Sequence, residues 1–235
     1  MTIIIEEHRT ILQFKAAVLR ADADNYEDTE ELNVSIYGGD FVLIRLTRLE
    51  QTSIFADASA GLIKTVQGAV SFLGNDWQRL PPDLANAMRG RIGRVFSSGN
   101  WIRRLSLMEN ILLPQLHHTR RPLSDIHGEA AALAERFHLA GIPLDLPGDC
   151  RPAELRYAAC VRAFLGRPNL VLLEEPTGGS FFEIVPPLIN TIRDARNRGS
   201  AVIWLTRHSE IWNDRSLPVN RRYRLAGRRL LEVAP

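Results

Sequence analysis

The stretch LVLLEEPT, from Leu170 to Thr177, decides the fold class. Its four consecutive apolar residues are typical of a strand buried on both faces of a parallel sheet, and two carboxylates follow at its end. An amphipathic helix pattern follows over 184–198, Gly199 ends it, and the apolar run AVIWLT over 201–206 predicts the next strand. Strand, helix and strand in this order predict a parallel α/β unit with a right-handed crossover.

The same alternation extends toward both ends of the chain. FVLIRL over 41–46 predicts another buried strand, and apolar residues at helical spacing over 124–139 predict another helix. The arginine-rich tail 220–235 alternates apolar and polar residues around Ala226-Gly227, which predicts a terminal hairpin with a solvated face rather than a nucleic-acid patch. The fold class expected is therefore α/β with a largely buried sheet.

Composition narrows the function classes. The 235 residues are 45% apolar and 24% charged, and the net charge of +2 gives no reason to expect a nucleic-acid partner. No apolar run approaches the ~18 residues of a membrane span, and MTIIIEEHRT lacks the order of a secretory signal, so we expect a soluble, cytoplasmic chain. Cys150 and Cys160 are interpreted as structural thiols because neither has a partner at metal-ligand spacing.

Several short segments carry a family resemblance. They are GDFV at 39–42, AGL at 60–62, GAVSF at 68–72, LSLMEN at 105–110 and RAFLGRP at 162–168, followed by LVLLEEPT. Their order and spacing resemble the ATP-binding subunits of ABC transporters over nearly the whole chain. The resemblance implies one P-loop NTPase-like (ABC ATPase) domain, with a core at about 1–96 and 161–235 and a small helical subdomain at about 97–160. LLPQL at 112–116 favours the lipid-trafficking, Mla/Mce-associated kind.

The nucleotide motifs of that family are degenerate in this sequence. Its phosphate loop, GxxxxGK[ST], wraps phosphates with backbone N–H groups, a Lys and a hydroxyl that binds Mg²⁺. The matching positions are Leu46, Gln51, Thr52 and Ser53, so only the hydroxyl is kept. In the alternative of an unconventional active ATPase, Arg45 or Arg48 would supply the missing charge.

The replaced loop has a helix-capping pattern of its own. Thr47 and Glu50, three residues apart, fit a capping box before a helix over 51–60, in which each side chain bonds the other's backbone N–H. The alternative is that they are an ordinary exposed pair. In the first case, a carboxylate stands where a phosphate would bind.

Other nucleotide-binding positions of the family are also occupied by different residues in this sequence. In the family, each ATP lies between one protomer's phosphate loop and the other's signature LSGGQ, which corresponds here to 150–154, CRPAE. The glutamine that senses Mg²⁺ and water corresponds to Ser97, and the switch histidine to Arg207, or to His208 if the alignment slips by one residue. The segment that crosses between protomers corresponds to 178–181.

Two carboxylates are the exception. Glu174 stands at the family's magnesium-coordinating Asp and is one methylene longer, and Glu175 matches the catalytic base. Without the resemblance, two acidic residues at the end of a strand do not indicate catalysis. Such residues are as often solvated, or paired with nearby arginines, as they are catalytic.

The resulting hypothesis is a transporter subunit that has lost nucleotide turnover and needs no cofactor. It would dock to a membrane permease on the cytoplasmic face, as a homodimer or with another ABC subunit, through 97–108, where Trp101 is either an interface centre or core. The first alternative is an active ATPase that uses ATP and Mg²⁺. The second is a scaffold or regulatory module unrelated to transport.

Overall fold

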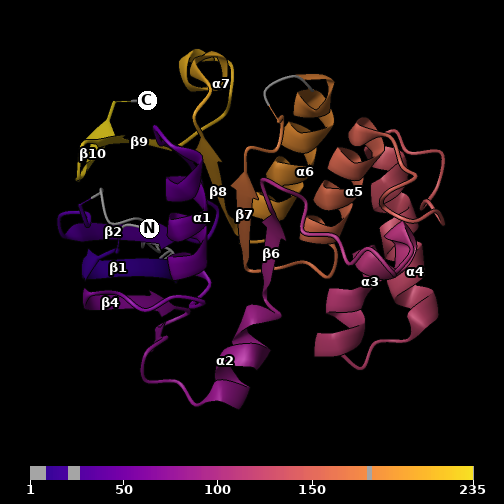
Figure 1. The fold of residues 1–235 in the computed structure, drawn as a ribbon, viewed down its shortest axis with the longest axis horizontal. Helices are drawn as coiled ribbons and strands as arrows, with labels where there is room; N and C mark the ends of the chain where they lie inside the picture. The colour runs from indigo at the N-terminus through magenta and orange to yellow at the C-terminus, as the bar shows by residue number, and fades with distance from the viewer. Residues whose placement is uncertain (1–8, 21–26, 179–181, 235) are drawn as a thin grey trace, which may run out of the picture.

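The computed structural model describes residues 9–20, 27–178 and 182–234 (Figure 1). Among these residues, the main sheet has six strands: β9, β3, β8, β7 and β6 are parallel to one another, and β10 is antiparallel to β9. The strand order is β10 (Arg229–Val233), β9 (Arg221–Ala226), β3 (Phe41–Arg45), β8 (Ala201–Thr206), β7 (Leu170–Glu174) and β6 (Ile92–Val95). The predicted strands and the terminal hairpin are confirmed.

A second, antiparallel sheet packs beside the first. Its order is β2 (Leu32–Tyr37), β1 (Thr10–Val18), β4 (Gln67–Phe72) and β5 (Asn75–Asp76). Helix α1 (Leu49–Ser59) lies between the two sheets (Figure 1). One core cluster joins this sheet and α1 to alternate residues of the main sheet, such as Val42 and Ile44. The turn between β3 and α1 is at the surface, with Thr47, Leu49 and Glu50 exposed, and the chain re-enters the core at Thr52.

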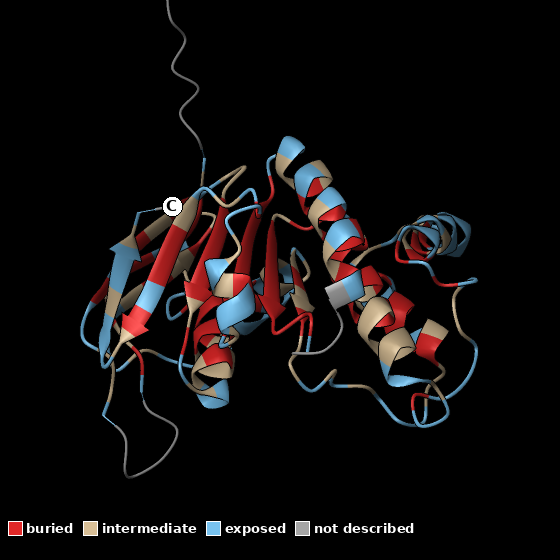
Figure 2. Cartoon of the chain, turned by 90° about the horizontal axis from the view of Figure 1, so that it is seen from above, coloured by how far each residue is buried: buried red, intermediate tan, exposed pale blue. Residues whose placement is uncertain are grey.

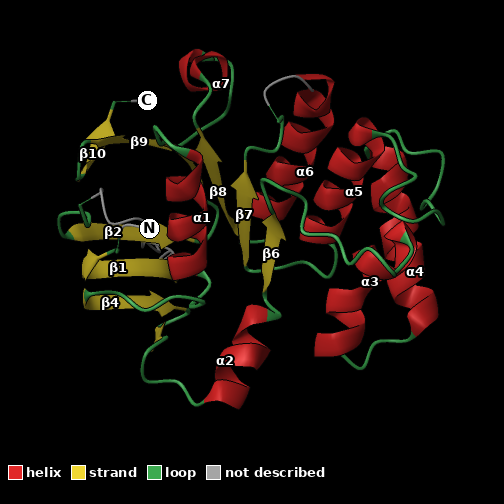
Figure 3. Ribbon diagram, in the orientation of Figure 1, coloured by secondary structure: helices red, strands yellow, loops and turns green. Residues whose placement is uncertain are grey.

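Most of the remaining helices cover the other face of the main sheet. The described helices beyond α1 are α2 (Pro82–Arg89), α3 (Leu107–His118), α4 (Leu123–Arg136), α5 (Pro152–Phe164), α6 (Val185–Asn197) and the short α7 (Ser209–Asn213). Figure 3 shows α3, α4 and α5 grouped beyond α6. Phe41 and Leu43, which alternate with the residues facing α1, pack in the cluster formed with these helices. The central strands are buried throughout (Figure 2), as their uninterrupted apolar runs predict.

The helix patterns are placed as expected, with small shifts. The pattern over 124–139 forms α4, and the pattern over 184–198 forms α6, which connects the parallel strands β7 and β8. Within the described part of the chain, no helix combines the length and apolarity needed to cross a bilayer.

Candidate functional site

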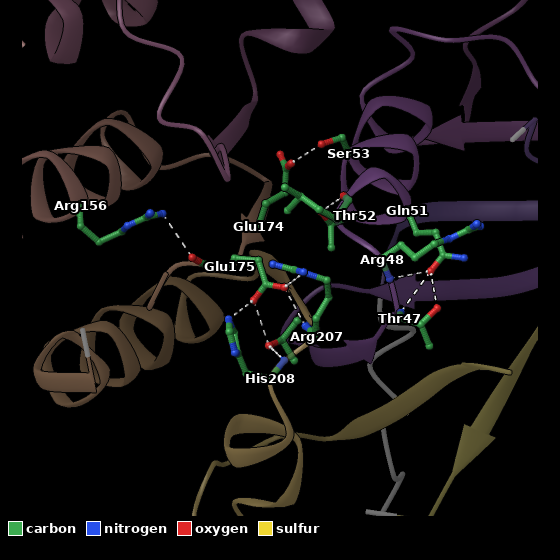
Figure 4. Close-up of polar contacts among 12 residues, drawn as sticks. Thr47, Arg48, Gln51, Thr52, Ser53, Arg156, Glu174, Glu175, Arg207 and His208 are labelled. Carbon is green, nitrogen blue, oxygen red and sulfur yellow. Dashed lines mark hydrogen bonds and ion pairs between the residues drawn. The ribbon is translucent and has the colours of Figure 1, made fainter. Parts of the chain in front are cut away.

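The candidate site lies where β3, β7 and β8 end. Because these strands are parallel, their carboxyl ends meet at one edge of the sheet. Glu174 ends β7, Thr206 ends β8, and the turn after β3 leads into α1 (Figure 4). The structure therefore brings Thr52, Ser53, Glu174, Glu175 and Arg207 into one region, as the resemblance implies.

The turn before α1 is closed by Gln51. Its side-chain oxygen accepts hydrogen bonds from the backbone N–H groups of Thr47 and Arg48, each at 3.1 Å, and from the Thr47 hydroxyl at 3.0 Å (Figure 4). A phosphate loop directs such N–H groups at the ligand. Here two of them are engaged by a side chain of the same turn.

This arrangement corrects the predicted capping box. The helix begins at Leu49 rather than at residue 51, and Arg48, not Thr47, is its N-cap residue. The reciprocal bond comes from Gln51 and not from Glu50, because Gln51 is the third residue of the helix when Arg48 is the cap. Arg48 has no side-chain acceptor, so only the Gln51 half of the box is formed.

The hydroxyl groups of Thr52 and Ser53, the next two residues of α1, bond to different partners. Thr52, at the family's lysine position, is buried, and its hydroxyl donates to the Leu49 carbonyl at 2.5 Å. Ser53, at the magnesium-ligand position, donates from its hydroxyl to Glu174 Oε2 at 3.1 Å. Of the two, only Ser53 contacts the carboxylate at the metal position.

Glu174 is paired with an arginine that the sequence analysis did not single out. Arg94, on β6, lies with its Nε 2.5 Å from Glu174 Oε1 and its Nη1 2.6 Å from Asp57 Oδ1 of α1. Burial raises the pKa of the Glu174 carboxyl, and the hydrogen bond from Arg94 opposes that rise. The signal available in the sequence was a basic residue inside the strand IGRV, next to apolar neighbours.

Magnesium does not fit these side chains as they lie. One Glu174 oxygen contacts a guanidinium and the other a hydroxyl proton, whereas Mg²⁺ requires oxygen ligands at about 2.0 to 2.1 Å in octahedral geometry. Among the described residues, no group of three or more His, Cys, Asp or Glu side chains is placed to hold a metal ion.

Glu175 is held from both sides of its carboxylate. Oε1 accepts from the Arg207 backbone N–H at 2.7 Å and from its Nε at 3.1 Å, and Oε2 accepts from the Thr206 hydroxyl at 3.2 Å (Figure 4). His208 Nε2 lies 3.5 Å from the same Oε2, so both residues considered for the switch position contact Glu175. A general base must hydrogen-bond the proton that it removes, and this carboxylate is already bonded within the protein.

The backbone of Glu175 is also unusual. Its φ of +45° lies in the left-handed region, which costs free energy for a residue with a Cβ. Three backbone contacts hold it: its N–H donates to Leu205, and its carbonyl accepts from Gly178 N–H and from Arg156 Nη1. The geometry of this position is therefore determined by its surroundings.

The signature segment is closed in a similar way. Arg151 is the N-cap of α5, Pro152 is the first helical residue and offers no N–H, and Glu154 accepts from the Arg151 backbone N–H at 2.9 Å. The family's Ser and Gly contacts to a phosphate are therefore absent from this described turn. The inter-protomer position at 178–181 falls largely outside the described residues.

Ser97 and Trp101 lie in the segment that follows β6. Ser97 is in the turn after β6 and makes no hydrogen bond to the described carboxylates of the site. Trp101 is half-buried, with the Arg162 guanidinium 4.2 Å from its ring centroid. In the proposed docking segment 97–108, the exposed residues are Ser98, Asn100, Ile102, Arg103 and Arg104.

No model of a protein family matches the chain. It is 29% identical over 133 residues to the octopine permease ATP-binding protein P of Rhizobium meliloti, a match covering 57% of this chain and 51% of that protein. It is 31% identical over 154 residues to the macrolide export ATP-binding/permease protein MacB of Syntrophobacter fumaroxidans, covering 63% of this chain and 21% of that protein. The chain thus matches about half or less of the length of these two relatives.

Two further comparisons cover more of the chain. It is 26% identical over 185 residues to the uncharacterized ABC transporter ATP-binding protein YvcR of Bacillus subtilis, covering 78% of this chain and 71% of that protein. The fold matches the bacterial ABC transporter cassette MJ0796, solved as a dimer, with a TM-score of 0.82 and 18% identity over 96% of this chain and 100% of that one. The chain therefore has the P-loop NTPase fold of an ABC ATPase cassette, and its sequence resembles ABC transporter ATP-binding subunits.

Proposed function

We propose that this protein is the ATP-binding-cassette-like subunit of a membrane transporter, that it no longer hydrolyses ATP, and that it acts by docking to a permease. The transport part is supported by the relatives, whose names are those of permease and export ATP-binding proteins. Docking would place the chain on the cytoplasmic face of the membrane, paired with a second copy or with another ABC subunit.

The loss of hydrolysis is carried by one observation: the Glu175 carboxylate is bonded through both oxygens to Thr206 and Arg207. These contacts occupy three of the about four lone-pair positions of the carboxylate, which leaves little room for it to bind and orient an attacking water. The contacts of Gln51 with the Thr47 and Arg48 N–H groups support the same conclusion for phosphate binding.

The transported substrate rests on one segment of the sequence. A lipid is suggested only by LLPQL, which lies within α3. The names of the relatives refer to octopine and to macrolides, and they describe those proteins. We therefore propose a transport role and keep lipid trafficking as a hypothesis to be tested with the permease identified.

Calorimetric titration with Mg-ATP, with and without the permease, tests the proposal. Charge-assisted hydrogen bonds contribute about 1.5 to 3 kcal/mol each, and about 1.4 kcal/mol is tenfold in Kd, so losing the lysine and two N–H donors should weaken binding by at least about a thousandfold. We expect no saturable binding in the micromolar range and no phosphate release, with an active cassette as the positive control.

Micromolar binding with hydrolysis would instead favour the active ATPase. The variants Arg45→Ala and Arg48→Ala would then identify the substitute for the lysine, since Arg45 ends β3 and Arg48 caps α1. Failure to co-purify with any permease, together with absent hydrolysis, would favour the scaffold module.

A further inference from the structure

Arg94 links three elements of the core. It lies on β6, its side chain is 9% exposed, and β6 runs parallel to β7, with Arg94 opposite Leu172. Its guanidinium contacts Glu174 at the end of β7 and Asp57 on α1, at 2.5 and 2.6 Å. Ser53, one turn before Asp57 on α1, donates to the other oxygen of Glu174. We refer to Ser53, Asp57, Arg94 and Glu174 as the Arg94 network.

The network needs a cation at its centre. The Glu174 side chain is 1% exposed, and a carboxylate that deep in the protein is costly unless it is paired and hydrogen-bonded. Asp57 brings a second negative charge toward the same point. A planar guanidinium can reach both carboxylates at once with separate N–H groups, which a lysine ammonium on a flexible stem does less well.

The Arg94 guanidinium contacts the carboxylate at the family's metal position. The resemblance places a divalent cation beside Ser53 and Glu174, and the structure has the Arg94 guanidinium bonded to Glu174 there. Glu174 is one methylene longer than the family's Asp, and its Oε1 contacts Arg94. A metal ion could bind Glu174 Oε1 only after Arg94 had moved away.

We propose that Arg94 is a built-in counter-ion that replaces the divalent cation of the cassette fold, so that the Arg94 network is closed to metal and becomes a metal site only when Arg94 is removed. The inference deepens the proposed loss of hydrolysis and rests on it. It concerns residues of one chain and is tested with no nucleotide present, so its failure is distinct from a failure of the ATP titration.

The experiment compares four forms of the full chain: wild type, Arg94→Met, the double variant Arg94→Met/Glu174→Gln, and Arg91→Met. Methionine keeps much of the side-chain volume of arginine without its charge, and Arg91 is an exposed arginine three residues away that serves as the matched control. Melting temperature is recorded with EDTA and with increasing Mn²⁺, and Mn²⁺ binding is measured separately by electron paramagnetic resonance.

We expect the melting temperatures of wild type and Arg91→Met to be independent of Mn²⁺. Arg94→Met should melt about 6 to 12 °C lower in EDTA, since it leaves the buried Glu174 carboxylate without its counter-ion, and should regain stability with Mn²⁺. The double variant should recover much of the loss and bind less Mn²⁺ than Arg94→Met.

Three results would overturn the inference. The first is saturable Mn²⁺ binding to wild type that is as tight as to Arg94→Met and that the double variant lacks. The second is an Arg94→Met variant that folds normally and gains no Mn²⁺ binding. The third is that Arg94→Met and the double variant both fail to fold, with or without Mn²⁺. Arg94 would then act through packing and not through charge.

Discussion

At the scale of single residues, three side chains fill positions near the ends of β3, β7 and β8. Gln51 accepts from the N–H groups of the turn after β3, Arg94 pairs with Glu174, and Arg207 pairs with Glu175. Each contact matches the polarity of its partner: an acceptor faces donors, and cations face carboxylates. The local electrostatics are thereby satisfied without a ligand.

Gln51→Ala should lower the free energy of unfolding by about 0.5 to 2 kcal/mol, the usual cost of losing a helix cap. Its oxygen accepts from three donors, and an alanine leaves all of them to water. Urea denaturation measures the loss, with Glu50→Gln on the neighbouring exposed residue as the control. A larger loss from Glu50→Gln than from Gln51→Ala would restore the capping box predicted from the sequence.

Glu175→Gln should destabilise the protein by about 1 to 3 kcal/mol, because its NH2 group would either face the N–H donors of Arg207 or leave the Thr206 hydroxyl without its acceptor. Urea denaturation and phosphate release are measured on the same samples, with Glu210→Gln, an exposed residue of α7, as the control. If the variant kept its stability and abolished a measurable ATPase activity, Glu175 would be a working base.

At the scale of elements, the turn between β6 and the following helices is anchored by α5. Arg162 of α5 donates to the Gly99 carbonyl at 2.6 Å, and its guanidinium lies over the rings of Trp101 and Phe96 at 4.2 and 5.5 Å. Burial lowers the pKa of Arg162 to about 10, so it is still charged at neutral pH. The turn is therefore held to the helix by both polar and aromatic contacts.

Arg162→Met should lower the free energy of unfolding by about 1 to 3 kcal/mol, since it removes a charge-assisted hydrogen bond and a cation–π contact. Hydrogen exchange should also become faster at residues 97–101, which the guanidinium fastens to α5. Arg193→Met, on the exposed side of α6, is the matched control and should change neither quantity. Unchanged exchange at 97–101 in Arg162→Met would show that the turn is held by other contacts.

The two cysteines should differ in reactivity. Burial raises the pKa of Cys160, inside α5, to about 12, whereas Cys150 is only partly buried. The folded state thus favours the neutral thiol of Cys160, so stability from this group is complete below pH 9 and falls as pH rises from 9 toward 12.

At pH 8, iodoacetamide should leave Cys160 unmodified in the native protein and modify it after denaturation. Peptide mass spectrometry separates the two thiols, and Cys150 serves as the internal control because it is nearer the surface. Equal native labelling of both cysteines would mean that α5 opens readily.

The elements differ in how far the sequence predicts them. Runs such as LVLLEEPT and AVIWLT predict β7 and β8 because burial on both faces leaves an uninterrupted apolar signal. The predicted start of α1 was wrong, because Glu50 and Gln51 can both close a capping box. Which of them is the third residue of the helix depends on which residue is the N-cap, and the backbone makes Arg48 the N-cap. Arg94 was missed since it meets Glu174 across 80 residues of sequence.

At the scale of the whole molecule, the resemblance predicts two phosphate-binding turns, and both are closed in this chain. Gln51 closes the turn before α1, and Glu154, with Pro152, closes the start of α5. In the family, ATP joins the phosphate loop of one protomer to the signature of the other. A nucleotide-bridged dimer would require both turns to open.

We therefore expect that Mg-ATP does not change the oligomeric state of the protein, as measured by sedimentation velocity with and without nucleotide. The control is a variant with the family's loop residues restored, Leu46→Gly/Gln51→Gly/Thr52→Lys. The restored loop should gain affinity for ATP, because it regains the lysine and frees the Thr47 and Arg48 N–H groups. It should still not dimerise, since Pro152 offers no N–H to a partner's phosphate and Glu154 would repel it. An ATP-dependent dimer of the wild-type chain would mean that the closed turn of α5 opens on binding, and the protein would then be a nucleotide-responsive cassette.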